Sequence, residues 1–216
     1  MSFQTSVKIR GRHHEHHFHI FFSSSPNVGR FREFYYWDTY WIIKALLHYD
    51  MTNTVKGILE NFLLMVNTYG CVPNGGRIYY TKRSQPPYLT LMVKEYMDKT
   101  ADIGFLRSQL PTLVRELEFW ECKRSVVVEK DGKSYQLFAF GTGGTGPRPE
   151  SYREDVEMAD EFATEPEKED FYFHMKAGAE SGWDYSTRWF INKNVSKQII
   201  GDLIWLAGKV EVNDVL

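Results

Sequence analysis

The most restrictive feature of this chain is an apolar pattern in its second quarter that fits an amphipathic helix. Apolar residues between positions 55 and 66 recur at intervals of three and four, which places their side chains on one face of an α-helix. Thr52 precedes the pattern as a candidate N-cap, and Gly70 follows it as a candidate C-cap. The pattern predicts that this helix buries Val55, Ile58, Leu59, Phe62, Leu63 and Val66.

Other segments also predict helices. Between Glu33 and His48, apolar and aromatic residues occupy almost every helical face, which predicts a helix buried on several sides. Pro86-Pro87 can open a third helix and Asp102 can cap a fourth, which Pro111 is expected to separate from a fifth. A last helix is expected at 171–180. The third, fourth and fifth helices are expected to carry Met92, Tyr96, Phe105, Leu106, Leu110, Leu113, Leu117 and Trp120.

A β-hairpin is predicted between these helices. Val126-Val127-Val128 is followed by Asp131-Gly132, a pair that favours a tight two-residue turn, and then by Tyr135, Leu137 and Phe140. The chain has no internal repeat that would indicate a solenoid. Five or six helices with one small hairpin predict a mainly α fold, in which the helices suit a toroid.

Composition limits the possible partners. The chain has 216 residues, enough for one domain with a core, a net charge of −2 and a pI near 6.4. Without a basic excess it has no electrostatic footprint for nucleic acid or an anionic membrane. It has no apolar run of 18 residues, and residues 1–25 lack the pattern of a secretory signal. Neither a compartment nor an oligomeric state is predicted.

Cysteine, histidine and acidic residues predict no cross-link and no built metal site. Cys71 and Cys122 are expected as reduced, structural thiols at buried helix ends. Residues 1–25 have no amphipathic period and are expected to be disordered. Ten acidic residues between Glu150 and Asp170 are expected on a solvated helical surface, because no calcium-loop motif is present. Adventitious metal binding is the expected property of the terminal histidines, which are His13, His14, His16, His17 and His19.

One glycine-rich motif is rejected as a nucleotide site. Residues 141–146 match G-x-G-x-x-G and follow a predicted strand. In a dinucleotide-binding fold the third glycine opens a helix that receives the pyrophosphate, but here Pro147-Arg148-Pro149 follows, with no parallel βαβ unit around it. A loop that carries Arg148 and Glu150 to a site is the better interpretation.

The segment 29–41 indicates a sugar site. It reads GRFREFYYWDTYW, which combines two cations, two carboxylates and seven aromatic residues. Aromatic faces cover the C–H faces of a pyranose, while arginines and carboxylates bind hydroxyls through charge-assisted hydrogen bonds.

This segment closely resembles the first signature of the trehalases, glycoside hydrolase family 37, whose form is P-G-G-R-F-R-E-x-Y-Y-W-D-[ST]-Y. Other segments resemble trehalase motifs in the same order. They are Val72-Pro73-Asn74-Gly75-Gly76-Arg77, Arg83-Ser84-Gln85-Pro86-Pro87, Gly146-Pro147-Arg148-Pro149-Glu150-Ser151-Tyr152 and Ala179-Glu180-Ser181-Gly182-Trp183-Asp184.

The resemblance implies a fold and a reaction. The fold is an (α/α)6 toroid of two helix rings, of which this chain would hold about half the helices. The reaction is hydrolysis of α,α-trehalose to two glucose molecules with inversion and without a metal or organic cofactor. An inverting glycosidase needs one protonated carboxyl and one carboxylate, roughly 6.5–9.5 Å apart.

The resemblance also implies the site residues. Asp184 is the general acid, with Trp183 and Tyr185 beside it to exclude water and favour its neutral form. The residues expected to bind the substrate are Arg30, Phe31, Trp37, Asp38, Asn74, Arg83, Arg148 and Glu150. Taken singly, each arginine could be a surface ion pair, Trp37 a core ring and Asp184 a helix cap. His48 and His174 are assigned to packing.

The resemblance covers only part of the family's pattern. The extent of the resemblance divides the chain into a terminus at 1–25, a partial catalytic domain at 26–194 and a divergent tail at 195–216. The family's general base, a downstream glutamate after a second signature, has no counterpart here, so the chain is expected to be truncated and inactive alone. Animal relatives are commonly secreted or membrane-anchored. Two other interpretations stay open: a non-catalytic trehalase-like protein, and a glycosidase of another linkage preference on the same toroid.

Overall fold

The computed structural model describes residues 5–10, 15–20, 33–141, 143–184 and 186. The chain forms two compact units, each built from two stretches of sequence. Unit 1 comprises residues 1–78 and 87–117, and unit 2 comprises residues 79–86 and 118–216.

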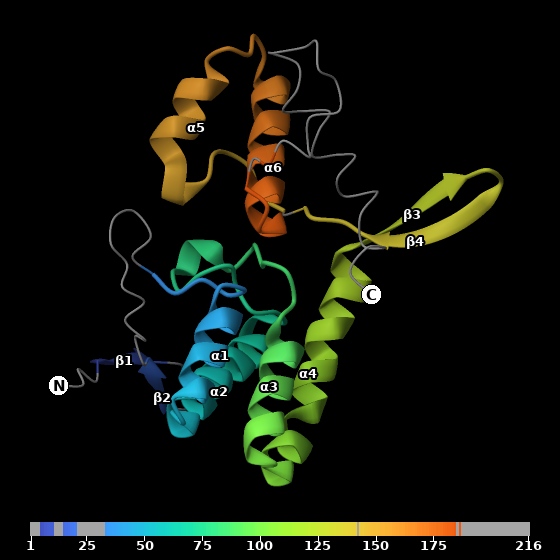
Figure 1. The fold of residues 1–216 in the computed structure, drawn as a ribbon. Coiled ribbons are helices and arrows are strands. Elements are labelled where there is room, and N and C mark those ends of the chain that lie inside the picture. The colour runs from blue at the N-terminus through green and yellow to red at the C-terminus, as the bar shows by residue number, and fades with distance from the viewer. Residues whose placement is uncertain (1–4, 11–14, 21–32, 142, 185, 187–216) are drawn as a thin grey trace. The chain divides into compact units, whose positions relative to one another are not determined.

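Helices make up most of the described residues, which confirms the predicted mainly α class. Figure 1 shows the elements as a ribbon. The α-helices are α1 (Thr39–His48), α2 (Thr52–Tyr69), α3 (Leu89–Thr100), α4 (Ile103–Lys123), α5 (Tyr152–Ala159) and α6 (Glu165–Ser181). Two short 3-10 turns, η1 (Ile78–Tyr80) and η2 (Pro149–Ser151), precede the third helix and the fifth. Two antiparallel pairs are formed by β1 (Thr5–Arg10) with β2 (Glu15–Ile20) and by β3 (Ser125–Lys130) with β4 (Lys133–Phe138).

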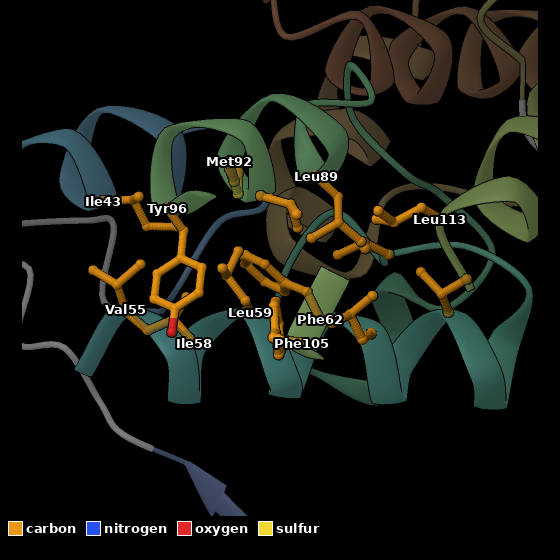
Figure 2. Packing of buried hydrophobic residues seen from close by; sticks show 14 of the residues in the cluster. Ile43, Val55, Ile58, Leu59, Phe62, Leu89, Met92, Tyr96, Phe105 and Leu113 are labelled. Carbon is orange, nitrogen blue, oxygen red and sulfur yellow. The ribbon is translucent and has the colours of Figure 1, made fainter. Parts of the chain in front are cut away.

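The core of unit 1 lies between the apolar faces of its helices. Helices α1, α2 and α3 pack on one another, and the first half of α4 adds Phe105 and Leu113 to the same cluster. Figure 2 shows these side chains meeting above α2. The predicted burial of the α2 face is confirmed for Val55, Ile58, Leu59, Phe62, Leu63 and Val66.

Helix α1 is shorter than predicted. It begins at Thr39 rather than Glu33, because the preceding residues form an extended contact instead. Tyr35 pairs with Gly75, and the Tyr36 amide donates to the Asn74 carbonyl at 3.0 Å. Of the helix residues, those buried are Thr39, Ile43 and Leu47, so the prediction of burial on several sides is wrong for this chain.

The predicted ends of α2 and the predicted starts of α3 and α4 are correct to within three residues. Gly70 ends α2 at φ 85°, a left-handed conformation that glycine adopts without strain. Asp102 caps α4 as expected, since its Oδ1 accepts from the Phe105 amide at 3.0 Å. Thr52, however, is the first helical residue rather than the cap, and α3 begins at Leu89 rather than at the prolines.

The predicted break at Pro111 is wrong, because α4 continues through it. Pro111 has no N–H to donate to the carbonyl one turn earlier, which costs a helix interior about 3 kcal/mol. Contacts on both sides of the proline offset this cost. Phe105 and Leu113 are buried, and Asn67 of α2 binds Thr112 at 3.3 Å and Arg115 at 2.9 Å.

The hairpin is confirmed. Strands β3 and β4 pair in register through Lys130 and Lys133, and Asp131 and Gly132 form the two-residue turn with φ of 52° and 71°. Positive φ at both central residues is the geometry that an Asp-Gly pair favours. Phe140 lies just beyond β4, where its ring meets that of Trp120 at 6.0 Å between centroids.

Helices α5 and α6 pack side by side in unit 2 (Figure 1) around Phe171, Tyr172 and Met175. Helix α6 starts at Glu165, six residues before the predicted start. Thr164 and Glu167 form a reciprocal capping box there, which satisfies two backbone amides. The capping residues lie inside the acidic segment. Because this segment lacks the apolar pattern that predicts a helix, the start of α6 was not predicted there.

Three further expectations meet the structure. Strands β1 and β2 lie within 1–25, where disorder was predicted. Cys71 is buried as predicted and Cys122 is exposed, so the predicted burial of Cys122 is wrong. The tail at 195–216 lies outside the described residues.

Candidate functional site

Arg83 is held in unit 2 by its neighbours. The segment after η1 turns back on itself, with the Arg83 amide donating to the Tyr80 carbonyl at 2.9 Å. The Arg83 guanidinium is 5.2 Å from the centroid of the Tyr80 ring, and its Nη2 pairs with Glu150 Oε1. Both side chains of this ion pair are largely buried. Two residues that were predicted to bind the substrate, Arg83 and Glu150, are therefore brought together.

One carboxylate oxygen of Glu150 accepts no hydrogen bond from the described residues. This oxygen, Oε2, is buried. A carboxylate oxygen in that state is costly unless a ligand or water supplies a donor.

Arg148 is fixed by a different carboxylate. Its Nε and Nη2 donate to Asp155 at 2.9 and 2.6 Å, and its backbone amide also donates to Asp155 at 2.9 Å. Asp155 is fully buried and Arg148 nearly so. This bidentate pair corrects the expectation that the acidic segment is solvated throughout. It sets the direction of the guanidinium in advance of any ligand.

Glu180 joins three segments of unit 2. It lies near the C-terminal end of α6 and is fully buried. Its two carboxylate oxygens accept from the Ser84 amide at 2.8 Å, from Arg124 Nε and Nη2 at 2.9 Å each, and from the Gly141 amide at 2.9 Å.

The glycine-rich segment at 141–146, called the glycine loop below, is also bound to α6. The Gly146 amide donates to Glu169 at 2.9 Å, and Lys176 Nζ donates to the Gly144 carbonyl at 2.6 Å. A carboxylate occupies the amide that a bound phosphate would need, which supports the rejection of the nucleotide interpretation. Burial lowers the pKa of Lys176 from its usual value.

Asp184, the proposed general acid, follows α6 directly. Gly182 ends that helix in a left-handed conformation at φ 70°, and the Trp183 amide donates to Ser181 Oγ at 3.1 Å. Asp184 and Trp183 are both exposed in this chain. Asp184 is therefore open to water rather than shielded as expected, and Tyr185 lies outside the described residues.

Three other predicted residues lie in unit 1. Trp37 packs edge-on against Trp41 and Tyr88, with ring centroids 5.4 and 5.9 Å away. Asp38 is exposed and flanks the start of α1, where desolvation by nearby protein atoms raises its pKa from the usual value. Asn74 is buried beside the extended contact described above. Arg30 and Phe31 lie outside the described residues.

Four buried polar residues were missed by the sequence reasoning. In unit 2, Asp155 pairs with Arg148 and Glu180 pairs with Arg124. In unit 1, Glu116 of α4 accepts from the Tyr36 hydroxyl at 2.5 Å. Glu116 shares a helical face with Leu113 and Trp120, a spacing that signals burial.

The described residues lack two other features, a cluster of metal-ligating side chains and a membrane-spanning helix. No group of three or more metal-ligating side chains gathers among them. None of the helices in the described part of the chain is long and apolar enough to cross a membrane. His174, assigned to packing, is buried and lies 3.3 Å from Asp170. His48 is exposed at the end of α1, against the packing expectation.

Comparisons with known proteins agree on one family. The Trehalase family model matches residues 3–202, beyond both ends of the region 26–194 expected from the motifs. A trehalase from Homo sapiens is 51% identical over 181 residues, covering 82% of this chain and 31% of that protein. A trehalase from Apis mellifera is 52% identical over 169 residues, covering 78% of this chain and 27% of that protein.

A solved structure gives the same result for the fold. Neutral trehalase from Saccharomyces cerevisiae matches with a TM-score of 0.62 and 28% identity, covering 74% of this chain and 33% of that chain. That protein is an (α/α)6 barrel, so the expected toroid class is confirmed. The chain spans about three-tenths of the length of the relatives it matches.

Proposed function

We propose that this chain, which belongs to the trehalase family, supplies the sugar-binding and proton-donating part of an enzyme that hydrolyses α,α-trehalose to two glucose molecules. The observation that carries the proposal is the continuous family match at 3–202, which includes Asp184 and every proposed substrate-binding residue. The buried Arg83–Glu150 pair supports it, because both members come from matched motifs far apart in sequence.

The proposed chemistry is inverting. Asp184 donates a proton to the glycosidic oxygen as the bond from that oxygen to the anomeric carbon breaks. A carboxylate on the opposite face of the sugar activates the water that attacks the anomeric carbon. We assign no residue of this chain to that second role, because the family's motif for it has no match here.

The arginines provide the binding wall. Arg83 and Arg148 are each oriented by a carboxylate, so little side-chain entropy remains to be lost when a sugar hydroxyl binds. Glu150 Oε2 can accept from a sugar hydroxyl after a small side-chain rotation. Trp37 offers an aromatic face for a pyranose ring.

Binding is the first test. Titration of the chain with trehalose by calorimetry is expected to show saturable binding, with maltose and isomaltose binding more weakly. Arg83→Lys is expected to weaken binding about tenfold or more, because lysine lacks the planar fork. Arg153→Lys, at an exposed pair on α5, is the matched control and is expected to bind like the unchanged chain. Equal binding of all three sugars would contradict the proposed substrate.

Chemical rescue tests the proton donor. In plain buffer the chain is expected to release no detectable glucose. Azide can attack the anomeric carbon without a base, so trehalose with azide is expected to give one glucosyl azide and one glucose per turnover. Asp184→Asn is expected to abolish that product while trehalose binding persists. Azide-dependent turnover by Asp184→Asn equal to that of the unchanged chain would refute the assignment of Asp184.

The second candidate is a non-catalytic sugar-binding protein. It is favoured by the exposed position of Asp184, since a proton donor that works near neutral pH needs surroundings that exclude water. Saturable trehalose binding with no azide product under any condition would select this candidate.

A further inference from the structure

Glu180 is fully buried, and all the hydrogen-bond partners of its carboxylate are donors. Its side chain has no exposed area, and four donors share its two oxygens. Oε1 accepts from Ser84 and from Arg124 Nη2, while Oε2 accepts from Arg124 Nε and from Gly141. One side chain therefore satisfies two backbone amides and one guanidinium.

The donors come from segments that are distant in sequence. Ser84 lies 96 residues before Glu180, Arg124 lies 56 before it, and Gly141 lies 39 before it. Arg124 is itself held, with its guanidinium 4.9 Å from the centroid of the Phe119 ring. The carboxylate thus fastens three separate pieces of chain to the end of α6.

Two of the three fastened segments lead to residues of the proposed site. Ser84 directly follows Arg83, and Gly141 opens the glycine loop that runs to Arg148. Glu180 itself lies four residues before Asp184, which limits the distance between their Cα atoms to about 14 Å.

The glycine loop has a second attachment to α6. Lys176 holds the Gly144 carbonyl, and Glu169 holds the Gly146 amide. With Glu180 at Gly141, three side chains of one helix fix the loop at its start, middle and end.

We propose that Glu180, paired with Arg124, is a positioning residue that aligns the Arg83 segment and the glycine loop with the end of α6 that carries Asp184. The inference rests on the proposed function for its purpose, although the alignment itself is a property of unit 2 alone. Glu180 does not touch the substrate and acts through the residues that do.

A carboxylate is required because all four partners donate. Glutamine keeps the shape of the side chain but replaces one oxygen with an NH2 group, which would face two donors and lose two hydrogen bonds. It also leaves the Arg124 guanidinium without its counter-charge. Replacing both members of a buried ion pair with apolar residues often restores stability, but methionine cannot hold the two amides.

The experiment separates stability from positioning. Glu180→Gln is expected to lower both stability and trehalose affinity. The double variant Glu180→Met with Arg124→Met is expected to regain the unfolding midpoint of the unchanged chain, yet to bind trehalose about tenfold or more weakly. Its Ser84 and Gly141 amides are expected to lose protection from hydrogen exchange, measured by NMR. The matched control is Arg153→Met with Glu157→Met, an exposed ion pair in the same unit that is expected to change neither readout.

The outcomes are decisive for the proposal. A stable double variant with unchanged trehalose affinity and unchanged protection at Ser84 and Gly141 would overturn it. A double variant that stays unfolded would also overturn it, since the pair would then determine folding rather than alignment. If the unchanged chain binds no trehalose, the proposed function fails, and loss of amide protection in the double variant alone decides whether Glu180 aligns these segments.

Discussion

The buried Glu116 carboxyl gives the sharpest prediction about stability. Burial in unit 1 raises its pKa from 4.5 to about 7, although the hydrogen bond from Tyr36 opposes the rise. Its Oε2 is buried and has no hydrogen-bond partner among the described residues. Glu116→Gln removes the titration while keeping an oxygen that can accept from Tyr36.

The sign follows from proton binding in the two states. Between pH 4.5 and 7 the folded chain keeps the Glu116 proton, whereas the unfolded chain loses it. Folding stability from this group is therefore fully present below pH 4.5, falls as pH rises, and is lost above pH 7. With these two pKa values the loss between pH 5 and pH 8 is about 2.5 kcal/mol.

Urea titrations at pH 5 and pH 8 measure this loss. Amide resonances of α2 report on unit 1, which contains Glu116. The unchanged chain is expected to lose about 2.5 kcal/mol more unfolding free energy than Glu116→Gln over this range. Glu60→Gln, at an exposed position of α2, is the control and is expected to keep the pH dependence of the unchanged chain. If Glu116→Gln shows that same dependence, the reasoning is refuted.

Three further substitutions are expected to destabilise the fold. Asp155→Asn leaves the buried Arg148 guanidinium without its carboxylate and is expected to cost unit 2 about 3–5 kcal/mol in urea unfolding. Gly76→Ala places a Cβ 2.6 Å from the Phe34 ring and is expected to cost unit 1 about 1–3 kcal/mol, measured in the same way. Thr164→Ala removes the capping box of α6 and is expected to cost about 1 kcal/mol, with earlier exchange of the first-turn amides.

Each of these substitutions has a matched control. Glu154→Gln changes an exposed carboxylate beside Asp155 and is expected to be neutral. Gly143→Ala adds a Cβ with no atom within 4 Å and is also expected to be neutral. Thr164→Ser keeps the capping hydroxyl and is expected to stay within a few tenths of a kcal/mol of the unchanged chain. A control as damaging as its partner would contradict the corresponding mechanism.

Local patterns predicted the elements whose causes are local. The face of α2 was correct at all six positions because burial of one helical face leaves a repeat of three and four. The turn at Asp131-Gly132 was correct because that pair by itself favours positive φ at both positions.

Failures arose where the deciding contact is distant in sequence. Residues 33–38 read as helix, yet the pairing of Tyr35 with Gly75 and of the Tyr36 amide with the Asn74 carbonyl delays the helix until Thr39. Pro111 reads as a break, yet contacts from Asn67 and the core on both sides keep α4 continuous. The sequence around each segment does not predict either contact, because the partner residue is distant in the chain.

The candidate site divides in the same way. Motifs proposed Arg83, Arg148 and Glu150 as site residues, because the family resemblance carries them residue by residue. The carboxylates that orient Arg148 and the Arg83 segment, Asp155 and Glu180, could not be predicted, because residue type alone does not show whether a carboxylate is buried or solvated. Only the three-dimensional positions of their hydrogen-bond donors distinguish these two residues from the exposed acidic residues of the chain.

The contact between Ser84 and Glu180 also dictates an order of assembly during translation. The two residues are 96 positions apart, so ribosomes working at roughly 5–20 residues per second make Ser84 several seconds before its acceptor exists. During that interval the Arg124 guanidinium also lacks its carboxylate. A nascent chain that stalls before α6 would expose both groups to quality-control factors, so completion of unit 2 must await the last described helix.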